Sequence, residues 1–278
     1  MFEMFELTFM VYAFIACLIM SVMLSYLGIH VVARGIVFVD LAIGQISYLG
    51  IAFAGFMGWN EISVPIIFTL VGSVVLSFIR IRDKRLKLEA IIGIFYAVSS
   101  ALTVLFISKT PHGEADIQEV LFGNLLGVTQ GDLIKMGVVF GTLAVLHMIW
   151  YRRIFQITHE YENHQLKGGR SFLLWNIFFY LSIGLAIVFA IELGGVIPVF
   201  SFIIVPPVIA VILVKKESFV VVATLLCAII TSYFGLYFSY RWDFPTGASI
   251  VTTLGVLVLI AGTVKFIRSL VVHQEQRV

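Results

Sequence analysis

Charged residues are scarce in this sequence, and their scarcity identifies the solvent of the chain. Only 12% of the 278 residues are charged and 60% are hydrophobic, whereas a typical soluble domain has about 25% charged and about 45–50% apolar residues. A water-soluble globule cannot bury so much apolar surface beneath a polar exterior. The composition therefore excludes a soluble enzyme, a disordered tail and a secreted disulfide scaffold, and it predicts a chain surrounded mostly by lipid.

Cysteines and catalytic motifs are also sparse. Cys17 and Cys227 both lie in apolar runs, without a Cys-x-x-Cys or Cys/His cluster, so we expect two buried small side chains rather than a disulfide or a zinc finger. The sequence has no Walker P-loop, no His-Glu-x-x-His motif and no Gly-x-Ser-x-Gly motif. It therefore predicts neither a nucleotide site nor a hydrolase. The net charge of +2 gives no reason to expect a nucleic-acid partner.

Long apolar runs make up most of the chain. A membrane-spanning helix needs about 20 apolar residues, and runs of this size recur, apolar on all sides rather than alternating as in the strands of a membrane barrel. We therefore predict an all-α polytopic membrane protein with about eight or nine transmembrane helices. The helices are expected near residues 8–28, 36–57, 63–79, 90–108, 132–150, 172–191, 197–214, 218–238 and 246–264. We expect the first to be retained, because the basic segment of a cleavable signal does not precede it.

Basic residues gather on one side of this predicted bundle. All but three of the 18 Lys and Arg residues, the exceptions being Lys109, Lys135 and Arg241, fall in connections that share one side. The positive-inside rule makes this side cytoplasmic. Nine crossings then place the amino end outside, whereas eight crossings, with one early re-entrant segment, place it inside.

Two connections are long enough to hold short structures of their own. Residues 151–170 are polar and mixed in charge, which fits a solvated loop or one short helix along the membrane, closed by Gly168 and Gly169. This connection is the expected handle for a cytoplasmic partner. In the other, residues 109–132, the apolar stretch 120–126 is too short to span a bilayer and is expected in the interface or against the bundle.

Polar residues inside the apolar runs are candidates for function, because burying them in a membrane is costly. Asp40 lies near the start of the second predicted helix and shares one helix face with Gly44 and Ser47. Gln45 lies deeper, on the adjacent face. These residues fit either a tightly packed inner helix or a polar route through the bundle.

A second anomaly is a pair of consecutive prolines in a late apolar run. Pro206 and Pro207 remove two backbone donors, and a broken helix is tolerated in a membrane only where protein or water satisfies the freed carbonyls. Together with Ser201, five residues earlier, they fit either a structural kink or a break that gates or lines a substrate path. Both interpretations stay open at this point.

Four stretches that follow one another along the chain carry a recognisable pattern. They are residues 31–53, 121–129 (Leu-Phe-Gly-Asn-Leu-Leu-Gly-Val-Thr), 195–206 and 243–249 (Asp-Phe-Pro-Thr-Gly-Ala-Ser). In order and content they resemble the permeases of ABC importers for divalent metals, the zinc, manganese and iron type. The resemblance implies a type II-like ABC importer permease architecture. Residues 1–278 would form a single transmembrane domain in a bacterial inner or plasma membrane.

The resemblance also implies a function and a set of partners. The chain would be the permease subunit of an ATP-driven importer for a divalent transition metal, zinc or manganese foremost and iron next, working by alternating access. Its partners would be a cytoplasmic ABC ATPase, an extracytoplasmic metal-binding protein, a second copy of itself and the lipid bilayer, with no cofactor and no catalytic residue. The expected pathway residues are Asp40, Gln45, Ser47, Ser201 and Pro206, with Asp40 as metal ligand, and those expected to couple to the ATPase are Glu160, Glu162, His164 and Gly168.

One departure from the resemblance concerns the cargo. Family members usually carry Asp and His four residues apart on the second helix, and the corresponding positions here are Leu41 and Gln45. Asp40 lies one residue early, about 100° round the helix. An amide oxygen is a poorer ligand for transition metals than an imidazole, so another metal ion or a chelated metal is an open alternative. The alternative function is a self-sufficient secondary transporter or channel for cations, although the sequence shows no inverted repeat.

Overall fold

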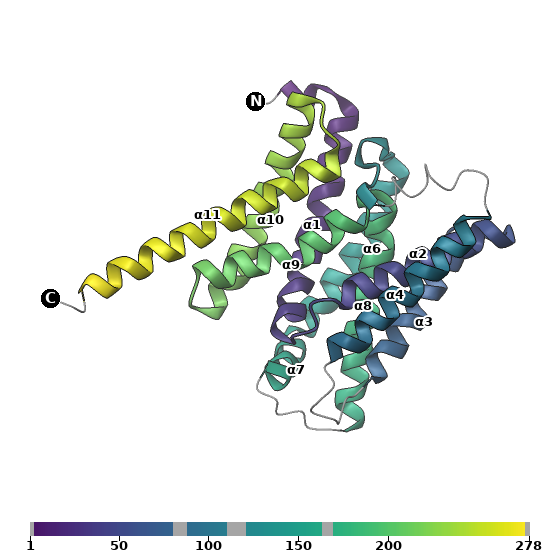
Figure 1. The fold of residues 1–278 in the computed structure, drawn as a ribbon, viewed down its shortest axis with the longest axis horizontal. Helices are drawn as coiled ribbons and strands as arrows, with labels where there is room; N and C mark the ends of the chain where they lie inside the picture. Colours follow the sequence, from purple (N-terminus) through teal and green to yellow (C-terminus); the bar gives the residue numbers. More distant parts are fainter. Residues whose placement is uncertain (1–2, 80–87, 110–120, 163–168, 276–278) are drawn as a thin grey trace.

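The protein is a bundle of helices (Figure 1). A computed structural model describes residues 3–79, 88–109, 121–162 and 169–275. The long helices are α1 (Thr8–Ala33), α2 (Val39–Met57), α3 (Ser63–Phe78), α4 (Leu88–Ile107), α6 (Gln130–Ile149), α8 (Arg170–Gly194), α9 (Val196–Leu213), α10 (Glu217–Trp242) and α11 (Thr246–Glu275). Shorter elements are α7 (Tyr151–Glu162) and two 3-10 helices, η1 (Glu3–Glu6) and η2 (Leu125–Gly127). Each of the nine ranges in which the apolar runs predict a helix overlaps one of these long helices, and several of the helices extend beyond the predicted range.

The lengths and hydropathy of these helices suit a bilayer. Within the described residues, 8 helices are long and apolar enough to cross a membrane, with mean hydropathy from 1.4 to 2.7 over their most apolar stretch. Helix α3 has 16 residues and is shorter. These values confirm a polytopic, all-α membrane protein with eight or nine apolar helices, as the sequence predicts.

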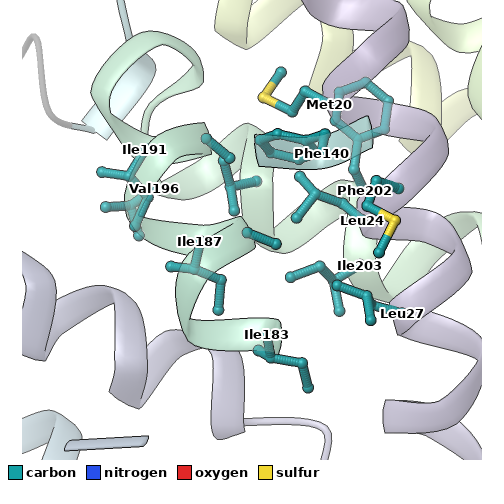
Figure 2. Packing of buried hydrophobic residues seen from close by; sticks show 14 of the residues in the cluster. Met20, Leu24, Leu27, Phe140, Ile183, Ile187, Ile191, Val196, Phe202 and Ile203 are labelled. Atoms are coloured by element: carbon teal, nitrogen blue, oxygen red, sulfur yellow. The ribbon is translucent and has the colours of Figure 1, made fainter. Parts of the chain in front are cut away.

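Helix α1 lies at the centre of the bundle, where it contacts α6, α7, α8, α9 and α10. Figure 2 shows Met20, Leu24 and Leu27 of α1 packed beside Phe202 and Ile203 of α9, with isoleucines of α8 on the other side. Lipid tails are as apolar as these side chains, so the helices associate through close van der Waals packing rather than through the hydrophobic effect. This requires helix faces that fit one another closely.

Small residues allow that close fit between α2 and α3. A Cβ atom placed on Gly50 of α2 would lie 2.7 Å from the Cα of Pro65 of α3, and one on Gly72 of α3 would lie 2.8 Å from Ile46 Cδ1 of α2. Contacts this short do not occur with a real Cβ, so a larger residue at either position would push the helices apart. The two helices are held as a tight pair.

Two ends of the bundle are distinguishable. Segment η2, the amino-terminal end of α1 and the turn between α10 and α11 lie together at one end, called here the η2 end (Figure 1). Helix α7 lies at the opposite end, called here the α7 end, beside the carboxyl end of α1. The polar residues singled out in the sequence divide between these ends and the core that joins them.

Candidate functional site

Asp40 is a buried carboxylate in the first turn of α2, and the residue is only 3% exposed. Its Oδ1 accepts a hydrogen bond from the backbone N–H of Leu41 at 2.8 Å, while Oδ2 has no hydrogen-bond partner among the described residues. The amino terminus of a helix favours negative charge, but a buried oxygen without a partner still costs free energy. Asp40 therefore carries an uncommitted acceptor inside the bundle.

The face of α2 that begins at Asp40 continues through Gly44 to Ser47. A Cβ atom on Gly44 would lie 3.1 Å from Ile191 Cδ1 and 3.9 Å from Ile187 Cγ2, so this face is turned toward α8. Ser47 is fully buried, and its hydroxyl also lacks a partner in the described part of the chain. The helical spacing predicted from the sequence thus places two uncommitted oxygens on one buried face.

Gln45 lies apart from this pair. Its side chain is half-buried, whereas those of Asp40 and Ser47 are buried, in agreement with its position on the adjacent face of α2. Among the described residues, no group of three or more His, Cys, Asp or Glu side chains is arranged to hold a metal ion. The arrangement thus offers individual oxygen ligands along α2.

Ser201 and the two prolines belong to α9, which is continuous from Val196 to Leu213. The Ser201 hydroxyl donates to the carbonyl oxygen of Ile197, one turn earlier, at 2.8 Å. Pro206 and Pro207 are buried within the helix. The prolines therefore do not end α9, and the carbonyl groups that they leave without their usual donors must be accommodated by neighbours.

Both of these carbonyl groups face helix α1. The N–H groups missing at Pro206 and Pro207 would have bonded the carbonyls of Phe202 and Ile203, four residues earlier. The Phe202 carbonyl instead accepts a hydrogen bond from the Ser25 hydroxyl of α1 at 2.9 Å. The Ile203 carbonyl occupies the space in which a Cβ atom of Gly28 would stand. The α1 face is therefore shaped to the backbone of α9 at its prolines.

Sequence interpretation did not single out Ser25 or Gly28. The available signal was the spacing of Ser21, Ser25 and Gly28 in the first apolar run, which places three small residues on one helix face. That signal marks a close helix contact without naming the partner. Only the folded chain shows that the partner is the proline pair of α9.

Three of the stretches that carry the family resemblance meet at the η2 end. The Asn124 N–H donates to the Leu193 carbonyl at 3.0 Å, which joins the segment before η2 to the end of α8. Gly123 and Gly195 have φ angles of 73° and 76°, a backbone conformation that other residues rarely adopt. A Cβ atom on Gly123 would collide with the backbone of Leu193 and Gly194, and one on Gly195 would collide with the backbone of Gly123. Gly247, at the start of α11, leaves none against the Phe122 carbonyl.

These contacts form a closure of main chain against main chain, called here the glycine interlock (Gly123, Gly195 and Gly247). They also answer a question that the sequence leaves open. The apolar stretch before α6 packs against the bundle, since Leu125 is almost fully buried and η2 contacts α1 and α11. The three motifs therefore serve one structural purpose at this end.

Helix α7 occupies the connection predicted to hold a short helix. Its buried side chains are Ile154, Ile157 and Thr158, which lie on one face at helical spacing. The helix ends at Glu162, and Gly169 is the N-cap residue of α8. The predicted coupling residues His164 and Gly168 lie outside the described residues.

The opposite face of α7 presents a row of polar side chains. Arg153 Nη1 donates to Gln156 Oε1 at 2.8 Å, and Gln156 Nε2 donates to Glu160 Oε1 at 3.4 Å. His159 Nδ1 lies 3.3 Å from Glu162 Oε2. Arg153, Gln156 and Glu162 are exposed, and Glu160 and His159 are half-buried. A short amphipathic helix with one apolar face on the bundle thus displays both charge signs outward.

Comparisons with known proteins agree with this architecture. The ABC 3 transport family matches residues 6–265. A "Probable iron transport system membrane protein" of Haemophilus influenzae is 28% identical over 178 residues, which cover 64% of this chain and 62% of that protein. The "Manganese transport system membrane protein MntC" of Halalkalibacterium halodurans is 22% identical over 260 residues, which cover 93% of this chain and 88% of that protein.

A solved structure shares the fold. "PsaBC from Streptococcus pneumoniae in complex with Fab" contains a chain that superposes with a TM-score of 0.77 at 21% sequence identity, covering 92% of this chain and 91% of that one. The family match, the apolar helices and the shared fold point the same way. The chain belongs to the ABC 3 transport family, as a multi-pass membrane permease subunit of a metal ABC transporter and not an enzyme.

Proposed function

We propose that this chain moves a divalent metal ion inward through the membrane by alternating access, with energy supplied by a separate ATPase. The observation that supports this most is Asp40, a buried carboxylate with one oxygen left without a partner among the described residues. An ionisable group in this setting is costly unless it serves a cation or a relay. Ser47 adds a second oxygen on the same face of α2.

Manganese is the cargo that this set of ligands favours. Carboxylate, hydroxyl and amide oxygens suit Mn²⁺, whereas imidazole and thiolate suit zinc, and Gln45 stands where the resembling permeases usually carry His. One relative is named for manganese transport and another for iron transport. A chelated metal is the second candidate cargo. Among the described residues, no group of three or more His, Cys, Asp or Glu side chains is arranged to hold a bare ion, and a chelated metal brings most of its ligands with it.

The pathway is proposed to run where α2 meets α8 and α9, because the face of α2 that carries Asp40 and Ser47 is turned toward α8 and α2 also contacts α9. Helix α9 carries Ser201 and Pro206 and contacts both α1 and α2. Asp40, Gln45 and Ser47 would form the α2 wall, and the region of Ser201 and Pro206 the α9 wall. The hydrogen bond from Ser25 of α1 to the Phe202 carbonyl of α9 fixes the position of α9 relative to α1. Alternating access would require these two helices to move together or to break this contact.

Energy and cargo are proposed to arrive from opposite ends. The α7 end would be the cytoplasmic one, because Arg34, Arg152 and Arg153 lie there. The polar face of α7 with Glu160 and Glu162 would bind the ATPase, together with His164 and Gly168. An extracytoplasmic metal-binding protein would deliver the ion at the η2 end. A second copy of the chain would complete the permease, with residues 1–278 forming one transmembrane domain in each copy.

Reconstitution tests this function directly. The chain would be expressed with its ATPase and binding protein, placed in liposomes, and supplied with Mn²⁺ on the outside and ATP on the ATPase side. We expect ATP-dependent Mn²⁺ uptake and Mn²⁺-stimulated ATP hydrolysis. Uptake by the chain alone, driven by a proton gradient, would instead show a self-sufficient secondary transporter, and failure to bind the ATPase would contradict the proposal.

A further inference from the structure

Thr158 of α7 is the centre of a buried polar cluster at the α7 end. The residue is only 4% exposed. The hydroxyl donates to the Ile154 carbonyl of α7 at 2.9 Å, accepts from Arg34 Nε at 3.2 Å, and lies 3.0 Å from His30 Nδ1. A hydroxyl has one proton to donate. Because Ile154 receives it, His30 Nδ1 carries the proton in the remaining bond, and Thr158 accepts from two residues of the α1 segment.

Arg34 is held by polar and aromatic groups rather than by an acid. It directly follows α1 and is 7% exposed, and the described residues include no carboxylate in a salt bridge with it. Its guanidinium lies 3.6 Å over the centroid of the Phe179 ring of α8, a cation–π contact. Burial lowers the pKa of Arg34 from 12.5 to about 10, so at pH 7 the group is charged. Such a cation is held firmly only while its few partners stay in place.

The cluster continues into two further helices. Arg34 Nη1 lies 3.5 Å from Asn176 Oδ1 of α8, and Tyr161 of α7 donates to the same oxygen at 3.1 Å. Asn176 Nδ2 donates to the Ser77 carbonyl of α3 at 2.8 Å. Side chains of α7 and Arg34 are thus connected by hydrogen bonds to α1, α8 and α3.

The position of Arg34 in the chain gives this cluster a consequence. Arg34 starts the short connection that leads into α2, whose first turn carries Asp40. A displacement of α7 therefore reaches this connection through Thr158 and Arg34, both of which are buried. We infer that the Thr158–Arg34 hydrogen bond, supported by His30 and Asn176, is the link by which movement of α7 repositions the start of α2 and with it Asp40. This inference rests on the proposed function.

The test separates transmission from mere anchoring. Thr158→Val keeps the shape of the side chain and removes the hydroxyl, while Thr158→Ser keeps the hydroxyl. Thr103→Val is the matched control, because Thr103 is about as buried as Thr158 and its hydroxyl, as far as the described residues show, bonds only the Ser99 carbonyl of its own helix, α4. The quantity measured is Mn²⁺ taken up per ATP hydrolysed by the complete complex in liposomes, which does not depend on how much complex is folded.

We expect Thr158→Val to lower this ratio about tenfold or more, because a hydrogen bond to a charged group is lost. Thr158→Ser should stay within about twofold of the wild type, and Thr103→Val should leave the ratio unchanged. Arg34→Lys keeps the charge but not the planar fork, and it should lower the ratio as Thr158→Val does. If the Thr158→Val chain does not assemble with the ATPase, the ratio measured for Arg34→Lys is the test of the inference.

The contrary outcome is also defined. If the Thr158→Val complex, or the Arg34→Lys complex where the first does not assemble, shows a lower thermal midpoint but a wild-type ratio of uptake to hydrolysis, the cluster only anchors α7 and the inference is wrong. A wild-type chain that binds no ATPase would refute the proposed function instead. The two failures are therefore distinguishable in one set of experiments.

Discussion

Buried polar atoms in this chain fall into two groups. Ser201 and Thr103 each donate to a carbonyl oxygen four residues earlier at 2.8 Å, so their hydroxyls are satisfied within one helix. Asp40 Oδ2 and the Ser47 hydroxyl have no partner in the portion of the chain that the structure describes. The first group tolerates apolar surroundings at little cost, whereas the second is where a passing cation would gain most.

The role of Asp40 is testable with one isosteric change. Asp40→Asn retains an oxygen that can accept from the Leu41 N–H and removes the negative charge. We expect Mn²⁺ uptake by the complete complex to fall at least about tenfold while the thermal midpoint stays within a few degrees, since only the attraction for the cation is lost. Glu192→Gln, at an exposed acid of α8, is the control. Unchanged uptake in Asp40→Asn would return Asp40 to a structural role.

The sequence predicts some of these residues and not others for a physical reason. Asp40 can be identified from the sequence because an acidic residue in an apolar run is costly to place in a membrane, and this is visible from its neighbours in the chain alone. Ser25 bonds a carbonyl 177 residues away, and Thr158 bonds a guanidinium 124 residues away. Each is an ordinary hydroxyl until its partner is known, so the folded chain was needed to identify both.

At the scale of elements, α1 and α9 behave as a matched pair. The two prolines of α9 leave two carbonyl groups without helix donors, and α1 supplies a hydroxyl for one and an empty position for the other. The sequence predicted a kink or a gate at these prolines. The structure shows a continuous helix whose irregularity is matched by its neighbour, so the fit between the two helices sets their relative position.

Gly28→Ala tests this fit. The added methyl group would overlap the Ile203 carbonyl of α9, so α1 and α9 must separate. We expect the free energy of unfolding to fall by about 1–3 kcal/mol, as for overpacked cores. Gly55→Ala in α2 is the control, because nothing lies within 4 Å of its added Cβ atom, and it should be neutral or stabilising by up to about 1 kcal/mol. Equal thermal midpoints for both variants would contradict the described contact.

The exposed face of helix α7 is the proposed binding surface for the ATPase. Glu162→Lys reverses one charge on an exposed position and touches none of the buried contacts of α7. We expect co-purification with the ATPase to weaken, by about fivefold or more in affinity if Glu162 lies in the interface. Glu61→Lys, an exposed acid between α2 and α3, should leave the affinity unchanged. If both variants bind the ATPase with wild-type affinity, Glu162 does not lie in the interface with the ATPase.

At the scale of the whole molecule, the apolar runs carried most of the information. Helix number and approximate bounds followed from run length alone, because lipid forces every spanning segment to satisfy its own backbone groups. The choice between eight and nine crossings did not follow, since α3 with its 16 residues lies near the lower limit for a span. How the helices pack was also beyond the sequence, since small residues mark close contacts without naming partners.

Orientation gives a prediction for the complete chain. Cys17 and Cys227 are buried, so cysteines introduced by Glu61→Cys and Arg153→Cys, both at exposed positions, would be the reactive ones. With nine crossings, a membrane-impermeant maleimide added to intact cells should label the cysteine at 61, and should label that at 153 only after permeabilisation. The reverse pattern would invert the assigned sides of the membrane.

The glycine interlock has a consequence for how fast the η2 end can rearrange. A contact made by one exposed side chain can break by a rotamer change in picoseconds to nanoseconds, but Gly123, Gly195 and Gly247 have no side chain to rotate. Their segments must part as whole units, which belongs to the microsecond-to-millisecond range of collective motion. Separation of the three segments at the η2 end would therefore be a slow, collective event.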